Sequence, residues 1–336
     1  MIRAAIVGIG TWGRNLVEAV QGKSELIRFV AGATRTPAAA ALYCKQQGIR
    51  LMESYEEVLA YGEIDAVVLA TPHSMHCEQI IAAAKAGKHV FVEKPLGVEA
   101  KSAAQAVAAC AQQKVTLAVG YNWRFQPALQ EAKRMLDDGR LGKLLHIEGN
   151  FCGPSAYRFS REHWRHDRDE APAGGMTGRG VHVVDAMLYL AGSHIGSVAA
   201  QSDRLVHDYG ADDTTSMLFR FESRATAYLG TVIATAETWR LQLFGSKGWV
   251  ELGDVAHLHT WDMKRSLLDP QDPLRRTPPE VISYPKASTE RAELEHFAAA
   301  AMARRPLAIP GGDEVHNVAV LEAIVRSARD GSRVQL

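Results

Sequence analysis

The sequence predicts an α/β protein with two domains. We expect a doubly wound parallel sheet over residues 1–121, because short β-branched runs alternate there with longer alanine-rich helical stretches. From Lys143 onward, strand-like runs follow one another directly, which predicts a C-terminal α/β domain with an open, mostly antiparallel mixed sheet over residues 122–336. With 336 residues and 47% hydrophobic content, the chain is long enough for two sizeable cores.

The expected elements follow from these runs in order. Strands of the first domain are expected at residues 4–7, 27–33, 64–70, 89–92 and 115–119, with helices such as 75–86 and 99–112 between them. Strands of the second domain are expected at residues 144–151, 198–206, 214–221, 225–233, 240–244 and 249–252. Helices at 290–303 and 313–329 either cover the second sheet or return to the first domain, and residues 160–175 and 269–285 are expected loops.

The composition narrows the class of partner. Lys and Arg number 38, as do Asp and Glu, so no global charge attracts nucleic acid or an anionic membrane. We expect a small-molecule partner. Met1 leads directly into a strand-like run, without a signal segment or an apolar run of membrane length, which predicts a cytoplasmic protein. The four scattered cysteines are expected to be reduced core residues: Cys44, Cys77, Cys110 and Cys152.

A glycine fingerprint follows the first expected strand, and a helix is expected to begin near its end. The segment consists of Gly8, Ile9, Gly10, Thr11, Trp12 and Gly13. Strand, glycines and helix in this order are typical of a dinucleotide-binding turn. The glycines allow a tight turn and close approach to a pyrophosphate, and N–H groups of the first helical turn bind the negative charge. We therefore predict that NAD or NADP binds here.

The end of the second expected strand indicates which dinucleotide. An acidic residue about 20 positions past the last glycine would accept hydrogen bonds from the ribose hydroxyls of NAD. This chain has Thr34 and Arg35 instead, and a hydroxyl and a guanidinium suit the 2′-phosphate of NADP. The sequence thus favours NADP, while stacking of Arg35 on the adenine or its exposure to solvent stays an alternative.

Two further strand ends carry polar residues. Ligands of an open parallel sheet bind beyond the carboxyl ends of the strands, so we expect cofactor contacts from Thr71, Pro72, His73 and His76. No third ligand accompanies the two histidines, so we expect no metal site. The run ending at Val92 is followed by Glu93, Lys94 and Pro95. Glu93 can tether the Lys94 ammonium at the cofactor, where it can stabilise negative charge on a substrate oxygen.

The segment at residues 174–185, GGMTGRGVHVVD, carries the second group of reactive residues. We expect an amphipathic helix to about Ala191, with His182, Asp185 and Tyr189 on one face at spacings of three and four. Its opposite face is apolar and consists of Val181, Val184, Leu188 and Ala191. His182 is suited to exchange a proton with a substrate hydroxyl, because the pKa of a free histidine lies close to working pH.

These motifs together resemble the Gfo/Idh/MocA family of NAD(P)-dependent sugar and polyol oxidoreductases, almost from end to end. The matching segments are GIGTWG, ATPHSMH, AGKHVFVEKPLG, VGYNWRFQP, GRLGK, GGMTGRGVHVVD, FGSKGWVEL and ELEHFAAA. The resemblance implies a Rossmann domain followed by an α/β domain whose open sheet forms dimer or tetramer contacts, and hence a homo-oligomer. It also implies that Lys94 and His182 are the catalytic lysine and histidine.

One position departs from the family pattern. Members commonly carry an aspartate four residues before the histidine, and this chain has Gly178. Asp185, or an acid from residues 167–170, is a possible substitute that orients His182. Arg179 beside the gap indicates either an anionic substrate such as a sugar acid or a solvated side chain.

The resemblance also suggests which residues contact the substrate. We expect substrate contacts from Tyr121, Arg124, His163, Trp164, Arg165 and Arg179. The predicted reaction is hydride transfer between NAD(P) and a secondary alcohol or carbonyl carbon of a sugar, inositol or sugar acid. In it, Lys94 polarises the oxygen and His182 exchanges the proton. A dihydrodiol dehydrogenase, a cofactor-retaining glycosidase-like enzyme and a non-catalytic NADP-sensing protein stay open as alternatives.

Overall fold

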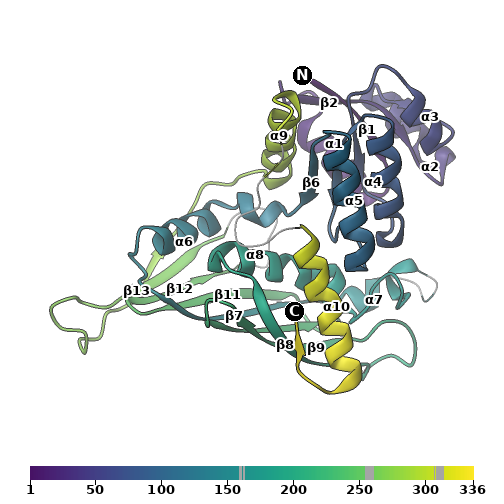
Figure 1. Ribbon diagram of the computed structural model, residues 1–336. Helices are drawn as coiled ribbons and strands as arrows, with labels where there is room; N and C mark the ends of the chain where they lie inside the picture. Colours follow the sequence, from purple (N-terminus) through teal and green to yellow (C-terminus); the bar gives the residue numbers. More distant parts are fainter. Residues whose placement is uncertain (159–160, 162, 254–260, 306, 308–313) are drawn as a thin grey trace. The chain divides into compact units, whose positions relative to one another are not determined.

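The chain divides into two compact units (Figure 1). A computed structural model describes residues 1–158, 161, 163–253, 261–305, 307 and 314–336. The first unit comprises Met1–Asn122 and Ser288–Ala308, and the second Trp123–Ala287 and Ile309–Leu336. The sequence predicts a single boundary at residue 121. In the structure helix α9 (Thr289–Met302), which comes after that boundary, belongs with the first unit, because its buried side chains join that unit's core. Ser160 and Asp313, in an expected loop and helix, lie outside the described residues.

A six-stranded parallel sheet forms the first unit. Its strands are β1 (Ile2–Val7), β2 (Ile27–Ala33), β3 (Arg50–Leu51), β4 (Ala66–Leu69), β5 (His89–Glu93) and β6 (Leu117–Gly120). The strand order is β3-β2-β1-β4-β5-β6, so the order reverses between β1 and β4. Sheets of this kind bind ligands beyond the carboxyl ends of the strands, at that reversal. The residues that directly follow β1, β2, β4, β5 and β6 at this edge are Gly8, Thr34, Ala70, Lys94 and Tyr121.

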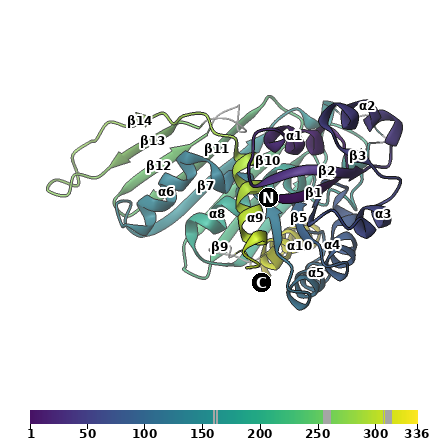
Figure 2. The ribbon, with the colours of Figure 1, turned by 90° about the horizontal axis from the view of Figure 1, so that it is seen from above.

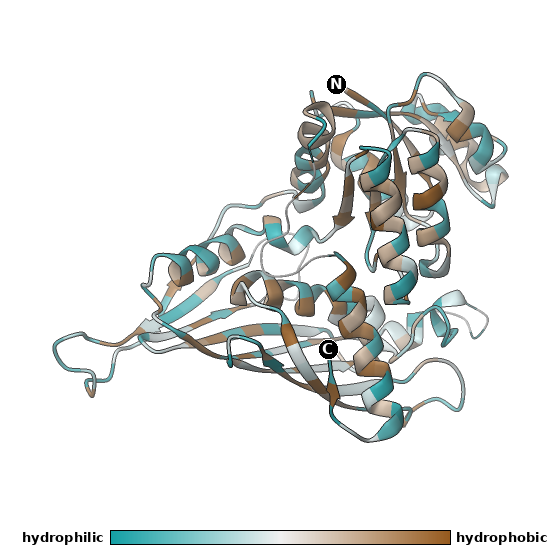
Figure 3. Cartoon of the chain, in the orientation of Figure 1, coloured by the Kyte–Doolittle hydropathy of each residue, from teal (hydrophilic) through white to brown (hydrophobic). Residues whose placement is uncertain are grey.

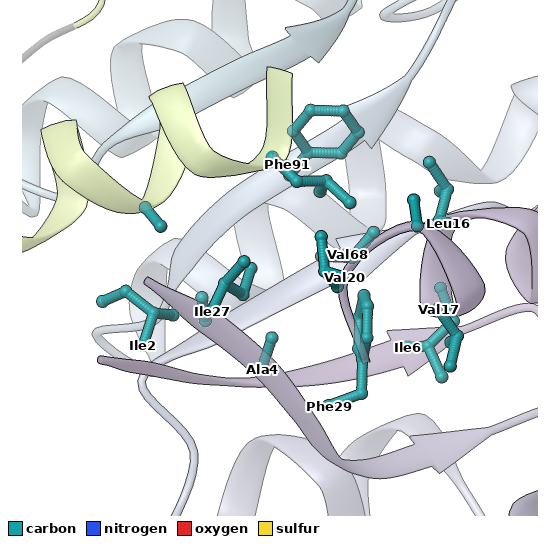
Figure 4. Close-up of a cluster of buried hydrophobic side chains, with 14 of the residues drawn as sticks. Ile2, Ala4, Ile6, Leu16, Val17, Val20, Ile27, Phe29, Val68 and Phe91 are labelled. Carbon is teal, nitrogen blue, oxygen red and sulfur yellow. The ribbon is translucent and has the colours of Figure 1, made fainter. Parts of the chain in front are cut away.

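Helices cover both faces of this sheet. They are α1 (Thr11–Val20), α2 (Pro37–Gln47), α3 (Tyr55–Ala60), α4 (His76–Lys85), α5 (Ala100–Gln112) and α9, with the short turn η1 (His73–Met75) before α4. Side chains of β1 and β4 alternate between the faces: Ala4, Ile6 and Val68 pack in one cluster with α1, α2 and α9 (Figure 4). α9 lies beside α1 (Figure 2). Val67 and Leu69 are buried on the opposite face, where α4 packs on β4 and β5.

A nine-stranded mixed sheet forms the second unit. Its strands are β7 (Leu144–Cys152), β8 (Ile195–Asp203), β9 (Thr214–Phe221), β10 (Thr226–Val232), β11 (Thr238–Gly245), β12 (Gly248–Leu252), β13 (Met263–Leu267), β14 (Glu280–Ile282) and β15 (Val334–Gln335). The order is β14-β13-β12-β11-β7-β10-β9-β8-β15, and β7 pairs with β10 in parallel while the other described pairs are antiparallel. The predicted fold class is therefore confirmed.

The helices of this unit pack on one side of its sheet. They are α6 (Pro127–Asp137), α7 (Ser155–Arg158), α8 (Val181–Ala191) and α10 (Glu314–Asp330), with the turns η2 (Asn122–Phe125) and η3 (Trp164–His166) and the π-helical turn η4 (Met176–Gly180). α8 packs on β7 and α10 on β8. The sheet's other side carries Leu218, 59% exposed, beside its partner Tyr228. A homo-oligomer through this sheet stays a prediction, which the molar mass in solution tests.

The structure corrects two expectations. Residues 269–285 are not all loop, because β14 pairs there with β13 although the segment between them is mostly hydrophilic (Figure 3). α8 is buried on nearly every side rather than amphipathic, because it lies between β7, α6 and α10. All four cysteines are buried and free. In the part of the chain that is described, no helix is both long and apolar enough to span a membrane.

Candidate active site

Three glycines shape the turn between β1 and α1, for two different reasons. A Cβ at Gly8 would lie 2.4 Å from the Ala70 carbonyl oxygen, and one at Gly13 would lie 2.0 Å from the Gly8 carbonyl oxygen. The packing of the chain itself therefore requires these two. A Cβ at Gly10 would meet no atom within 4 Å, and its φ of −82° suits any residue. The open space lies at the start of α1, where backbone N–H groups attract a pyrophosphate, so the turn fits a dinucleotide.

A second guanidinium, that of Arg14 on α1, is hydrogen-bonded to the helix that follows Arg35. Arg35 itself is exposed and Thr34 half-buried. Arg14 donates from Nη2 to the Ala39 carbonyl oxygen at 2.9 Å, and its guanidinium lies 4.8 Å from the centre of the Tyr43 ring. α2 begins at Pro37, so this hydrogen bond ties Arg14 to the first turn of the helix that follows Arg35. Arg14 was not predicted from the sequence, although its position directly after Gly13 is a signal for it.

The connection after β5 places a titratable carboxyl beside Lys94. Glu93 is buried, and burial raises the pKa of its carboxyl to about 7, while Lys94 and the indole of Trp12 lower it. Burial penalises the charged form of an acid, so this carboxyl changes charge near neutral pH. The Lys94–Pro95 peptide is cis. Lys94 thus follows a buried strand end and has an acid as its neighbour.

The connection after β4 is held by hydrogen bonds within the chain. Thr71 donates from Oγ1 to Gln79 Oε1 at 2.6 Å. The ring of His76 contacts the carbonyl oxygens of Pro95 and Thr71, and its exposed fraction is 0%. His76 is therefore enclosed between these two carbonyl groups, and its predicted contact with the cofactor stays a prediction. His73 is also buried, with its ring edge-on to His76 at 5.9 Å.

Aromatic rings surround His182 in the second unit. Trp123 stacks on the imidazole, with ring centres 5.3 Å apart and planes 16° apart, and Phe151 lies 6.4 Å away. Trp239 and Trp261 pack on Trp123 at 4.5 and 4.9 Å. These side chains are buried, so they hold the imidazole by packing. Trp239 and Trp261 were not predicted from the sequence, because they lie far along the chain in no local pattern.

A buried ion pair anchors α8 three residues after His182. Arg124 donates from Nε and Nη2 to the two carboxylate oxygens of Asp185, at 2.7 and 2.6 Å. Burial raises the pKa of Asp185, and Arg124 and Asn317 lower it. The sequence offers Asp185, or an acid from residues 167–170, as the group that orients His182, and it predicts that Arg124 contacts substrate. In the structure Asp185 and Arg124 pair with each other, because both face inward and each buried charge neutralises the other.

The remaining predicted residues lie in loops and turns. Arg179 contacts Glu237 at 3.3 Å and the Cys152 carbonyl oxygen at 3.2 Å, with its guanidinium over the Phe151 ring. A Cβ at Gly178 would meet no atom within 4 Å. His163, Trp164 and Arg165 stack on one another, and Tyr121 is buried in the first unit. Among the described residues, no three His, Cys, Asp or Glu side chains gather as a metal ion requires.

Family models match both units. Residues 2–121 match an oxidoreductase family with an NAD-binding Rossmann fold, and residues 129–251 match the GFO/IDH/MocA C-terminal domain. The chain belongs to the Gfo/Idh/MocA family. Like its relatives, this Gfo/Idh/MocA protein is an NAD(P)-dependent dehydrogenase that acts on CH–OH groups of a sugar or polyol.

Relatives of this Gfo/Idh/MocA chain match along its whole length. The inositol 2-dehydrogenase of Rhizobium meliloti (strain 1021) is 26% identical, with 100% of this chain and 99% of the relative covered. The scyllo-inositol 2-dehydrogenase (NAD(+)) of Bacillus subtilis (strain 168) is 28% identical, with 100% and 96% covered. A solved structure of aldose-aldose oxidoreductase from Caulobacter crescentus, complexed with glycerol, has a TM-score of 0.89 and 27% identity, covering 100% of this chain and 99% of that one.

The two kinds of glycine in the turn predict opposite outcomes for one substitution. Gly10→Ala should change the free energy of unfolding by less than about 1 kcal/mol, because nothing in the chain fills that space. It should weaken NADPH binding about tenfold or more. Gly13→Ala should instead lower the free energy of unfolding by about 3 kcal/mol through the clash with Gly8. Urea unfolding and fluorescence titration with NADPH measure both; unchanged NADPH affinity in Gly10→Ala would refute the assignment.

Proposed function

We propose that the enzyme interconverts a secondary alcohol and a ketone, or a cyclic hemiacetal and a lactone, on an uncharged sugar or cyclic polyol. When bound, NAD(P) accepts the hydride from the alcohol carbon or returns it to the carbonyl carbon. The observation that carries the proposal is the position of Lys94. It follows β5 at the sheet edge where the glycine turn follows β1, with β4 between the two strands.

Lys94 is proposed to act on the substrate oxygen. As the hydride leaves the carbon and the hydroxyl proton leaves the oxygen, negative charge develops on that oxygen. An ammonium donor placed there stabilises this charge more in the transition state than in the ground state. The neighbouring Glu93 carboxyl interacts favourably with the ammonium when it is ionised. Lys94 therefore polarises the oxygen without itself needing to lose its proton.

His182 is proposed to exchange the proton. In the oxidative direction the neutral imidazole takes the hydroxyl proton, and in the reductive direction the imidazolium returns it. The ring is 8% exposed and stacked on Trp123, so its orientation is set before substrate binds. The ion pair of Arg124 and Asp185 holds the helix that carries it. These contacts support His182 as an acid–base group with a fixed direction.

The surroundings of Arg179 favour an uncharged substrate over a sugar acid. Arg179 lies against Glu237, which also contacts Arg158. Burial lowers the pKa of the Arg179 guanidinium, and Glu237 counteracts that shift. A carboxylate arriving at this guanidinium would have to compete with one already in place.

NADP is the cofactor we propose, in preference to NAD. Arg35 lies in the connection after β2, where the 2′-phosphate of NADP binds in folds of this kind, and Arg14 is hydrogen-bonded to the first turn of the helix after that connection. Guanidinium groups bind phosphate oxygens with charge-assisted hydrogen bonds. Glu18 lies on α1, one turn after Arg14. Burial and the negative charge of Glu18 raise the pKa of Tyr43, whereas Arg14 lowers that pKa.

Removing the Lys94 ammonium should separate catalysis from cofactor binding. Lys94→Met should lower kcat on an accepted polyol about a hundredfold or more, because the charge on the oxygen loses its donor. The Kd for NADPH should change less than about threefold, since the adenosine and pyrophosphate contacts remain. Lys101→Met, an exposed lysine on α5, is the matched control and should leave both unchanged. Near-normal turnover by Lys94→Met would eliminate the proposed role.

Removing the Arg35 guanidinium should change the choice of cofactor. A charge-assisted hydrogen bond contributes about 1.5–3 kcal/mol, so Arg35→Ala should weaken NADPH binding about tenfold or more. The Kd for NADH should barely change, because NADH lacks the 2′-phosphate. Arg28→Ala, an exposed arginine at the opposite end of β2, should leave the ratio of the two Kd values as it is. The assignment fails if Arg35→Ala leaves that ratio unchanged as well.

A further inference from the structure

The ring of His76 lies between two groups that can only accept hydrogen bonds. Nδ1 is 2.8 Å from the carbonyl oxygen of Pro95, and Nε2 is 3.0 Å from the carbonyl oxygen of Thr71. The side chain has no exposed surface. Both ring nitrogens thus face backbone oxygens at hydrogen-bond distance, inside the first unit.

Hydrogen-bond chemistry determines what such a ring must be. A neutral imidazole carries one N–H and one bare nitrogen, and only the N–H can donate. With a neutral ring, one of the two contacts would place a nitrogen lone pair against an oxygen lone pair. A doubly protonated ring donates to both carbonyls, and hydrogen bonds from a charged donor are the stronger kind. The two distances therefore favour the imidazolium, because two charge-assisted hydrogen bonds to carbonyl oxygens offset the burial that by itself favours the neutral form.

We propose that His76 is a buried imidazolium ion that ties the end of β4 to the Lys94–Pro95 connection and so positions Lys94. Thr71 belongs to the connection after β4, and Pro95 to the connection after β5. One ring therefore joins the segments that follow two neighbouring strands, directly beside the lysine. His76 is a positioning residue, since it acts on Lys94 through the Pro95 carbonyl. The importance of His76 for catalysis rests on the proposed function, whereas the charge of its ring is independent of that function.

Several titratable groups lie on the segments next to His76. η1 contributes His73, edge-on at 5.9 Å, and the end of β5 contributes Glu93 and Lys94 on the N-terminal side of Pro95. On α4 itself, the pKa of the Cys77 thiol is raised by burial and by Glu99 near the start of α5, so this thiol is neutral near pH 7. Of the groups named here, Glu93 is the direct neighbour of Lys94 in the sequence, and its carboxyl carries a negative charge when it is ionised.

A second histidine of the first unit provides a matched comparison. The Thr116 backbone N–H donates to Nδ1 of His89 at 2.9 Å, so this nitrogen must be bare and His89 neutral. Burial lowers the pKa of His89, which agrees with a neutral ring. The same rule of donors and acceptors thus predicts opposite charge states for His76 and His89.

The charge state is tested by ¹⁵N NMR of the ring nitrogens in the full-length protein without substrate. Signals are assigned by their loss in His76→Gln and His89→Gln. Between pH 6.5 and 8, both nitrogens of His76 should have the shifts of protonated nitrogens, while His89 should show one protonated and one bare nitrogen. A bare nitrogen on His76 at pH 7 would overturn the proposal. No turnover is needed, so failure of the proposed reaction would not affect this result.

The proposal that His76 holds the two connections together is tested by hydrogen–deuterium exchange at residues 94–99. A glutamine amide has its two N–H groups on one nitrogen and cannot donate to both carbonyls as the ring does, so His76→Gln should speed exchange there about tenfold at pH 7.5. His89→Gln should leave exchange in this segment unchanged. Equal protection in His76→Gln and the unsubstituted protein would contradict the positioning role. If His76→Gln does not fold, His76→Asn takes its place, and the NMR spectrum of the unsubstituted protein still decides the charge.

Discussion

The close approach between the glycine turn and the end of β4 is the constraint on which the first unit depends. Gly8 lies so near the Ala70 carbonyl, and Gly13 so near that of Gly8, that no side chain fits at either position. This contact fixes where α1 begins and directs its free N–H groups to the sheet edge at which the strand order reverses. Gly10, which no packing requires, then leaves the space that a dinucleotide needs.

An aromatic contact and an ion pair fix His182, the proposed acid–base residue of the second unit. Two consecutive residues of η2 contact two residues of α8 that are three positions apart. Trp123 stacks on His182, and Arg124 forms an ion pair with Asp185. A buried ion pair contributes little net stability, but losing one partner costs about 3–5 kcal/mol, so such a pair fixes geometry. The aromatic contact and the ion pair together determine the direction of the imidazole.

Local patterns predicted the sheet class, the glycine turn and the place of Lys94, because strand, turn and helix signals each lie within a few neighbouring residues. Contacts between distant parts of the chain could not be read in this way. Arg124 and Asp185 are 61 residues apart. Similarly, β14 and β15 are three and two residues long and exist because a partner strand pairs with them. His76 was noticed in the sequence, but its enclosure could not be predicted, because it depends on Pro95 from the next connection.

The central claim is direct transfer of a hydride between a polyol carbon and the cofactor. It is tested by supplying NADP⁺ together with inositols and aldoses that carry deuterium on every carbinol carbon, and measuring the mass of the NADPH formed. The account predicts that at least one of these compounds yields NADPH with one deuterium, in an amount equal to the carbonyl product. NADPH without deuterium, or carbonyl product without NADPH, would contradict it.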